Sequence, residues 1–111
     1  MQKQKTKQIH INKIKPLLGK ASVIDIREKD EYLSGHLPNT KNIVMDELLN
    51  NPSKYLSKSE PTYLVCRSGR RSKDACEFLD KLGYQVIDVS GGIIEYDDKL
   101  EEKDWFKSVF F

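Results

Sequence analysis

The sequence predicts an α/β fold, with one domain built on a mostly parallel central sheet and helices on both faces. Three observations support this prediction. Short apolar runs alternate with segments of helical periodicity, as in chains made of repeated strand–helix pairs. The connections between these segments are short. The chain has 111 residues, which is enough for one hydrophobic core but not for two.

The first half of the chain contains three of the expected strands. A short strand at residues 8–10 leads into a helical stretch at 11–18, which Pro16 is placed to interrupt. The apolar run at 22–26 is typical of a buried strand, and a short helix at 28–33 follows it and ends at Gly35. The remaining expected elements are a brief strand at 42–44, a helical turn at 45–49, and loops at 50–53 and 58–61.

The second half of the chain contains the clearest helix. An apolar strand at residues 62–65 comes first, and a helical segment at 70–82 follows a short loop. Gly83 is a natural C-terminal cap for this helix. The apolar positions of the helix recur at helical spacing, and they are Ala75, Cys76, Leu79 and Leu82. A last strand at 85–89 leads into a glycine turn at 90–92 and a helical segment at 93–100.

Composition argues against several classes of function. The 19 basic and 17 acidic residues give a net charge of +2 and are mixed along the chain, so we expect no nucleic-acid partner. No apolar run approaches the length of a membrane span, and the basic start lacks the apolar stretch of a signal peptide. We therefore expect no membrane partner. Two cysteines cannot form a disulfide framework, which favours a reducing, cytoplasmic environment.

The expected domain spans residues 8–103. Residues 1–7 are expected to be a flexible tail, and residues 104–111 an aromatic tail. The aromatic side chains of that tail either close over the core or form a patch for a partner or a second copy of the chain, and they are Trp105, Phe106, Phe110 and Phe111. The cysteines and histidines have no metal-ligand spacing, so we expect neither a metal nor another cofactor.

The stretch from Cys66 to Ser72 carries the expected chemistry. Cys66 stands where a strand ends and a helix begins, so the free N–H groups and the positive dipole of the helix start lie near its thiol. Arg67, Arg70 and Arg71 add positive charge. A cysteine reacts as its thiolate, and these surroundings favour both a thiolate and a negatively charged substrate. No histidine lies near Cys66 in sequence, which argues against a cysteine–histidine pair.

This loop and several other segments resemble the rhodanese-type sulfurtransferases. The pattern Cys-x-x-Gly-x-Arg-Ser at residues 66–72 is similar to the active-site loop of that family. Residues 23–27, 31–32 and 35–43 look like its N-terminal signature, and residues 83–84, 91–93 and 96 look like its C-terminal one. The resemblance covers residues 8–100 and implies a single rhodanese-like domain.

The resemblance also implies a two-step reaction. The Cys66 thiolate attacks the outer sulfur of thiosulfate or another small anionic donor and becomes a persulfide. An acceptor such as cyanide or a cellular thiol, including a protein thiol, then takes that sulfur. Arg67 and Arg70 are expected to attract the donor, Arg71 to brace the loop, and Ser72 to help cap the helix. The catalytic residue is thus Cys66, and the substrate-binding loop consists of Arg67, Ser68, Gly69, Arg70, Arg71 and Ser72.

Residues outside the loop are expected to support it structurally. Asp25 and Arg27 are predicted to form an ion pair at a strand end, with Glu31 as a further partner of Arg27. His36 is expected to hydrogen-bond loop backbone rather than to react. Gly91 and Gly92 are expected to form a tight turn that allows close approach to the active loop, since glycine has no side chain and tolerates positive φ.

Two other functions remain open from the sequence. Cysteine phosphatases and arsenate reductases also use a reactive cysteine, but phosphatases have Cys-x5-Arg, whereas four residues separate Cys66 from Arg71 here. The shorter loop favours a persulfide over a bound phosphoryl group. The other alternative is a sulfur-carrier or docking module that has no turnover of its own. Cys76 shares the apolar helix face and is expected to be structural, without a bridge to Cys66.

Overall fold

A computed structural model describes residues 6–102, which contain one parallel sheet of five strands. The strand order is β1-β5-β4-β2-β3, so β4 is the central strand. The strands are β1 (Lys7–His10), β2 (Ser22–Asp25), β3 (Lys41–Asn42), β4 (Thr62–Val65) and β5 (Val86–Ser90). Every neighbouring pair runs parallel, so all five strands end at one edge of the sheet. Sites in open parallel sheets lie beyond that edge.

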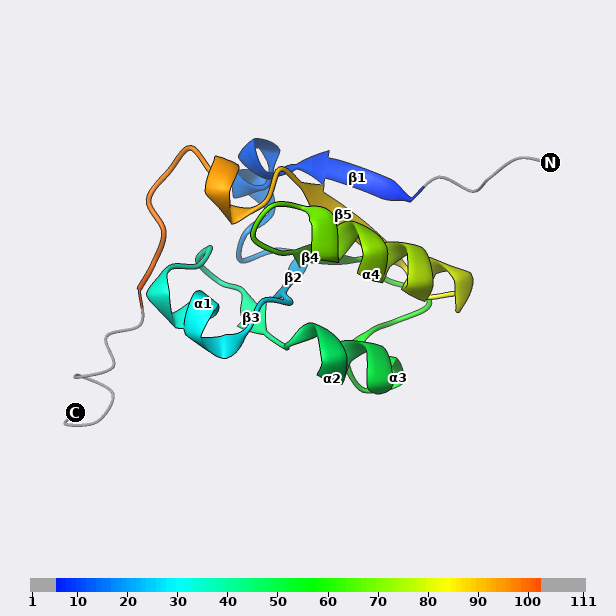
Figure 1. Cartoon of the computed structure of the whole chain (residues 1–111). Coiled ribbons are helices and arrows are strands. Elements are labelled where there is room, and N and C mark those ends of the chain that lie inside the picture. The colour runs from blue at the N-terminus through cyan, green and yellow to red at the C-terminus, as the bar shows by residue number, and fades with distance from the viewer. Residues whose placement is uncertain (1–5, 103–111) are drawn as a thin grey trace.

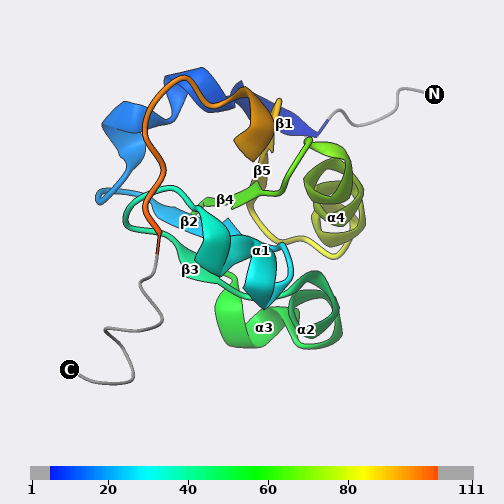
Figure 2. The ribbon, with the colours of Figure 1, turned by 60° about the vertical axis from the view of Figure 1, so that its left-hand side comes forward.

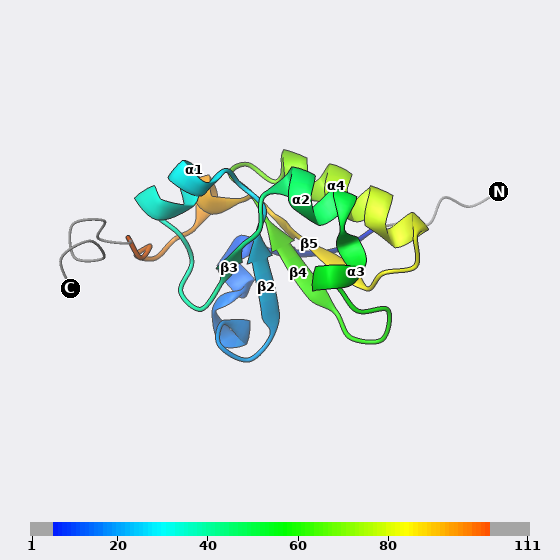
Figure 3. The same cartoon turned by 90° about the horizontal axis from the view of Figure 1, so that it is seen from below.

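Helical segments cover both faces of the sheet (Figure 1). Buried and partly buried side chains form two hydrophobic clusters, one that includes residues of α2, α3 and α4 and another that includes residues of three 3-10 turns. In Figure 3, α2 and α4 lie on one side of the sheet and the 3-10 turns of residues 11–17, in blue, lie on the other. The α-helices of the described chain are α1 (Lys29–Ser34), α2 (Met45–Asn50), α3 (Pro52–Tyr55) and α4 (Arg70–Lys81). The 3-10 turns are η1 (Ile11–Lys13), η2 (Lys15–Leu17) and η3 (Ile93–Glu95). The predicted fold class is therefore confirmed.

The central strand is buried on both sides. Leu64 packs into the cluster beneath the α-helices, whereas its neighbour Val65 packs into the cluster beneath the 3-10 turns. Successive side chains of a strand point to opposite faces, so an apolar run without alternation suits a strand that is covered on both faces. Figure 2 shows α4 beside β4 and β5 on the first face. This packing fixes the end of β4 against the start of α4.

Proline accounts for two local differences from the sequence prediction. Residues 50–53 were expected to form a loop, but α2 extends to Asn50 and α3 begins at Pro52. Proline fits the first turn of a helix, because its fixed φ is already helical and the N–H it lacks would have no partner. The helical stretch expected at residues 11–18 consists of η1 and η2, with Pro16 in the first turn of η2.

The helix predicted at residues 93–100 is wrong beyond its first turn, because only η3 forms there. Asp97 and Asp98 would lie near the end of such a helix, where the dipole disfavours acidic side chains. They instead form ion pairs with Lys15 at 3.1 and 3.2 Å. The backbone N–H of Asp97 also donates to the side chain of Asn12 at 2.8 Å. Tertiary partners therefore replace the helical hydrogen bonds.

The buried face of α4 is shorter than predicted. Ala75, Cys76 and Leu79 are buried as expected, but Leu82 is 46% exposed. Since α4 ends at Lys81, Leu82 lies past the part of the helix that packs on the sheet. The predicted terminal tails lie outside the described residues, apart from Thr6 and Lys7. Lys7 was predicted to belong to the N-terminal tail, but it is the first residue of β1 and pairs with β5. Within residues 6–102, we find no helix with the length and apolar character that a membrane crossing requires.

Candidate active site

Cys66 directly follows β4, so it lies at the edge where the parallel strands end. Its backbone carbonyl accepts a 3.0 Å hydrogen bond from the N–H of Ile93, which follows the glycine turn after β5. The cysteine is thereby held between the central strand and its neighbour. Its side chain has 0% exposure and belongs to the core cluster beneath the α-helices. The thiol is therefore covered by protein in this conformation.

Two main-chain donors contact the sulfur on its loop side. The N–H of Gly69 lies 3.2 Å from Cys66 Sγ, and the N–H of Ser72 lies 3.3 Å from it. Both amides belong to the start of α4, where N–H groups have no partner within the helix. The N-cap residue, Gly69, provides no side-chain acceptor for these amides. The sulfur of Cys66 accepts from them instead. An anion on Sγ would be stabilised by these amides and by the helix dipole.

Gly69 and Gly92 allow the loop to adopt this shape. Gly69 is the N-cap of α4 and has φ +93, a left-handed conformation that favours glycine. Gly92 has φ +70, and a Cβ there would lie 2.2 Å from the carbonyl oxygen of Arg67. The glycine turn thus packs directly on the active loop. Ile94 adds a 3.1 Å hydrogen bond from its N–H to the same carbonyl.

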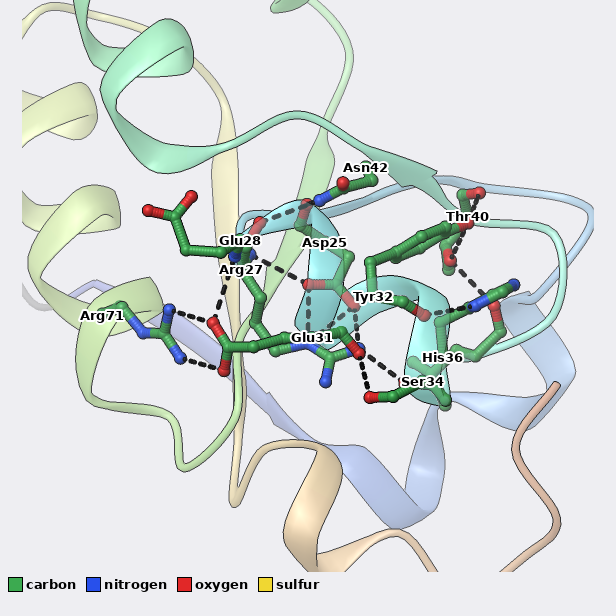
Figure 4. A network of polar contacts seen from close by, with 12 residues as sticks. Asp25, Arg27, Glu28, Glu31, Tyr32, Ser34, His36, Thr40, Asn42 and Arg71 are labelled. Carbon is green, nitrogen blue, oxygen red and sulfur yellow. Dashed lines mark hydrogen bonds and ion pairs between the residues drawn. The ribbon is translucent and has the colours of Figure 1, made fainter. Parts of the chain in front are cut away.

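The structure separates the three arginines of the loop. Arg67 and Arg70 are exposed, together with Ser68, and within residues 6–102 neither arginine forms an ion pair. Arg71 instead forms a bidentate ion pair with Glu31 on α1, with N–O distances of 2.9 and 3.0 Å (Figure 4). Two guanidinium groups therefore remain available to an anion outside the loop, while the third joins the start of α4 to α1.

The partner predicted for Glu31 was wrong. The sequence paired Glu31 with Arg27, but its carboxylate binds Arg71 and also accepts a 3.1 Å hydrogen bond from the N–H of Glu28. The hydrogen bonds from Arg71 lower the pKa of Glu31 to about 2, against the opposing effect of partial burial. The same pair raises the pKa of Arg71. Glu31 thus holds α1 and the active loop together.

The predicted ion pair between Asp25 and Arg27 is present at the end of β2. Both side chains are buried, and the shortest N–O distance is 2.8 Å. Arg27 also donates to the carbonyl of Gly35 at 2.7 Å, which fixes the end of α1. Figure 4 shows the side chains of Asp25 and Arg27 together. His36 stacks on Tyr32, and its Nδ1 lies 2.7 Å from the Tyr32 carbonyl oxygen. The structure places neither Asp25 nor His36 in contact with the sulfur.

The surroundings of Ser72 differ from those expected from the sequence. Its hydroxyl was expected to help cap α4, but Ser72 Oγ lies 2.5 Å from Asp88 Oδ1, 3.2 Å from the Gly69 carbonyl oxygen and 3.5 Å from Cys66 Sγ. Asp88 is 1% exposed and belongs to β5. One signal was available in the sequence, since Asp88 interrupts the apolar strand Val86–Ser90. The residue that it meets depends on the fold.

The described residues offer no obvious place for a metal ion. No group of three or more His, Cys, Asp or Glu side chains within residues 6–102 is arranged to hold one. Cys66 and Cys76 are both free thiols. Burial raises the pKa of the Cys76 thiol strongly, with smaller contributions from nearby acidic groups, so this cysteine is held in its neutral form. Cys66 alone combines a thiol with main-chain donors in this region.

Comparisons with known proteins agree with this architecture. The family model of the Rhodanese-like domain matches residues 7–99. "Putative sulfurtransferase YtwF" of Bacillus subtilis is 32% identical over 84 residues, which cover 74% of this chain and 79% of that protein. "Putative sulfur carrier protein YrkF" of the same organism is 32% identical over 81 residues, covering 72% of this chain but only 43% of the relative.

A solved structure gives the same result. The rhodanese-like domain protein from Staphylococcus aureus superimposes with a TM-score of 0.78 at 31% sequence identity, covering 89% of this chain and all of that protein. The family match spans most of the sequence and includes the sheet, the loop at Cys66 and the glycine turn that packs on it. The chain therefore belongs to the rhodanese-like domain family.

Proposed function

We propose that this protein is a sulfurtransferase that carries sulfur as a persulfide on Cys66. The observation that carries the proposal is the contact of Cys66 Sγ with the N–H groups of Gly69 and Ser72 at the start of α4. This arrangement suits a sulfur atom that becomes negatively charged. Membership of the rhodanese-like domain family, and similarity to a protein named as a sulfurtransferase, give further support.

The reaction has two displacement steps. The Cys66 thiolate attacks the outer sulfur of thiosulfate, the bond between the two donor sulfurs breaks, and sulfite leaves with the bonding electron pair. The protein then holds a Cys66 persulfide, whose outer sulfur carries the negative charge. Cyanide or a thiolate attacks that outer sulfur, and Cys66 leaves as a thiolate. No electrons are gained or lost overall, and the protein returns to its starting state.

Arg67 and Arg70 are proposed to attract the anionic donor. Both are exposed on the loop that covers Cys66, and fixed positive charge at the rim raises the local concentration of anions. Because the thiol has 0% exposure, the loop has to shift before the outer sulfur of the donor can reach Sγ. The partners are thus a small anionic sulfur donor and a thiol or cyanide acceptor. A reducing, cytoplasmic setting is part of the same proposal, because Cys66 must stay a free thiol between turnovers.

Phosphatase activity is less well supported. A phosphatase loop of the Cys-x5-Arg type uses its arginine to hold the phosphoryl group, whereas Arg71 here follows Cys66 after only four residues. Both terminal nitrogens of Arg71 are also engaged by Glu31. A phosphoryl group would have to displace a carboxylate in order to use this guanidinium. The geometry therefore favours sulfur chemistry at Cys66.

A sulfur-carrier role is the second candidate, because one relative is named as a sulfur carrier protein. A carrier would form the same persulfide but would release its sulfur only to a particular protein partner. The two roles differ in the second step. Release of the sulfur to cyanide in repeated turnovers supports a sulfurtransferase, whereas loading without such release supports a carrier.

The test is the intact mass of the purified protein before and after incubation with thiosulfate. We expect the wild-type chain to gain the mass of one sulfur atom and to lose it when cyanide is added. Cys66→Ser is expected to gain nothing. Cys76→Ser is the matched control, because it removes the other buried thiol and should still load sulfur. A wild-type chain that gains no sulfur, or a Cys66→Ser chain that does, would contradict the proposal.

A further inference from the structure

A chain of hydrogen-bonding groups joins Cys66 to a buried carboxyl group. Cys66 Sγ lies 3.5 Å from Ser72 Oγ, and Ser72 Oγ lies 2.5 Å from Asp88 Oδ1. The other carboxyl oxygen, Asp88 Oδ2, accepts a 3.4 Å hydrogen bond from the side-chain amide of Gln8 on β1. All three members of the chain are buried. The nucleophile is therefore linked through one hydroxyl group to an acid inside the protein.

Asp88 has no cationic partner within residues 6–102, since none of the ion pairs there includes it. Its neighbours in the sheet are Gln8 on β1 and Leu64 on β4, and both are uncharged. A buried carboxylate without a cation is costly. Accordingly, burial raises the pKa of Asp88, although the hydrogen bonds from Ser72 and Gln8 oppose this effect.

The charged groups near this chain do not supply the missing partner. On α4, Lys73 and Glu77 act on Asp88 in opposite directions. Cys76, also on α4, is held neutral by burial. On the side of Cys66, Arg71 is already paired with Glu31. The protonation of Asp88 therefore depends mainly on its burial and on the hydrogen bond from the Ser72 hydroxyl.

The hydroxyl of Ser72 has one proton, which makes the two ends of the chain depend on each other. When Asp88 is ionised, Oδ1 accepts a hydrogen bond from the Ser72 hydroxyl. The Ser72 oxygen can then only accept a hydrogen bond from a Cys66 thiol. When Asp88 is protonated, it donates to Ser72. The Ser72 hydroxyl is then free to donate to the sulfur or to the Gly69 carbonyl. A thiolate fits only the second arrangement.

We propose that Asp88 is a positioning residue that acts through Ser72 and shares one proton with Cys66, so that the thiolate forms together with a protonated Asp88. The S–H bond of Cys66 breaks and its proton passes to Ser72 Oγ, while the Ser72 hydroxyl proton passes to Asp88 Oδ1. The net charge of the pair is unchanged, and no electron leaves it. The Ser72 hydroxyl then faces Sγ as a donor, beside the N–H groups of Gly69 and Ser72.

This arrangement deepens the proposed sulfur transfer and rests on it for its role in turnover. In the second step, Cys66 Sγ leaves as an anion when the acceptor takes the outer sulfur. A Ser72 hydroxyl that donates to Sγ stabilises this leaving group, and it can do so only while Asp88 holds its proton. Asp88 would thus assist the release of sulfur without touching the donor or the acceptor.

The test is the pH dependence of Cys66 alkylation by iodoacetamide, with the modified cysteine identified by peptide mass mapping. The protonated thiol does not react with iodoacetamide, so the alkylation rate at each pH reports the fraction of Cys66 present as thiolate. Asp88→Asn is neutral at every pH and can still donate to Ser72, so it resembles the protonated carboxyl group and does not repel the thiolate. We expect its midpoint to fall by about one pH unit, since coupled acids typically interact by at least that much. A profile that coincides with the wild type would overturn the proposal.

Three further variants separate coupling through Ser72 from simple charge effects. Glu77→Gln is the matched control, because it removes another negative charge near Asp88 without touching the hydrogen-bond chain, and its midpoint should shift much less. In a Ser72→Ala background, Asp88→Asn should shift the midpoint by less than about half as much. An undiminished shift there would mean that Asp88 acts only through space, and the proposal would be wrong. Asp88→Val gives a second neutral variant if Asp88→Asn does not fold.

The two proposals fail in different experiments. Alkylation needs no sulfur donor, so the shared proton is measured whether or not the protein transfers sulfur. A chain that shows the predicted shift but takes up no sulfur would contradict the function and leave the proton sharing intact. A chain that takes up sulfur but shows no shift in Asp88→Asn would contradict the role of Asp88 alone.

Discussion

Two buried aspartates, Asp25 and Asp88, belong to parallel strands of the same sheet but have opposite surroundings. Asp25 is held by the guanidinium of Arg27 at 2.8 Å, and it also accepts a 3.0 Å hydrogen bond from the Arg27 N–H. Asp88 is met by a serine hydroxyl and a glutamine amide. The comparison shows that burial alone does not define the role of a carboxyl group. A cation fixes Asp25 as part of the scaffold, whereas Asp88 has no such partner among residues 6–102, and burial raises its pKa.

The position of each aspartate relative to Cys66 follows the same division. Asp25 and Arg27 secure the end of β2 and the end of α1, and the structure places neither against the sulfur. Asp88 faces the start of α4 and reaches the sulfur through Ser72. Substitutions at the first site should therefore change mainly stability, while those at the second should change mainly the chemistry of Cys66.

The largest effect is expected from breaking the pair at β2. Arg27→Met removes the cation and leaves Asp25 buried and unpaired, which should lower the free energy of unfolding by about 3–5 kcal/mol. The measurement is chemical denaturation at neutral pH. Asp25→Asn/Arg27→Met, which removes both charges, is the matched control and should recover part of the loss. Equal stability of Arg27→Met and the wild type would show that this pair does not hold the scaffold.

The next effect is expected at the glycine turn beside Cys66. Gly92→Ala would place a Cβ 2.2 Å from the Arg67 carbonyl oxygen at a φ of +70, so the active loop has to move. We expect a loss of about 3 kcal/mol in stability and a marked loss of sulfur uptake. Gly83→Ala is the control, since Gly83 also has positive φ but its Cβ would meet only the flexible side chain of Lys58 at 3.9 Å. An active, stable Gly92→Ala protein would argue against this close approach.

A smaller effect is expected at the partly exposed pair of Glu31 and Arg71. The folded pKa of Glu31 is about 2, below its ordinary value of 4.5. The pair therefore stabilises the fold above about pH 4.5 and loses this contribution as the pH falls toward 2. Glu31→Gln should cost about 1 kcal/mol at neutral pH, because solvent screens the pair. The stability difference from the wild type should shrink as pH falls through this window, which unfolding at several pH values would reveal.

The smallest effect on stability is expected at Asp88. Burial raises the pKa of this carboxyl group, so its ionised form is the less favourable one in the folded protein. The stability it contributes is present at low pH and is lost as the pH rises through its folded pKa. Asp88→Asn should therefore lie within about 1 kcal/mol of the wild type at neutral pH. A loss as large as that of Arg27→Met would mean that Asp88 is scaffold after all.

The order of strands and helices, and the position of Cys66 where a strand runs into a helix, could be predicted because their signals are local. The extent of the last helix could not, since Asp97 and Asp98 pair with Lys15 instead. The alternation of apolar runs and helical segments predicted the parallel sheet. The loop pattern between an apolar run and a helical segment predicted the position of Cys66 at the end of a strand.

The partners of the charged residues were not accessible in the same way. Glu31 is closer in sequence to Arg27 than to Arg71, yet it binds Arg71, which lies 40 residues away. That choice depends on the fold, which brings Glu31 on α1 to Arg71 at the start of α4.

The contact between Ser72 and Asp88 depends on the fold in the same manner. These residues are separated by 16 positions, and they meet because α4 packs on β5 with the Ser72 side chain facing the sheet. One aspartate in a strand of apolar residues indicates that the carboxyl group needs a hydrogen-bond partner. The sequence does not identify that partner as Ser72. The complete burial of the Cys66 thiol is a further result of packing that the loop sequence alone does not reveal.

The central claim is tested most directly by a single-turnover transfer from Cys66. The protein is loaded with thiosulfate, freed of excess donor and mixed with cyanide, while peptide mapping locates the extra sulfur and thiocyanate is measured. We predict that the sulfur is found on Cys66 and appears as an equal amount of thiocyanate. Extra sulfur on Cys76, or loaded Cys66 that yields no thiocyanate, would contradict this account.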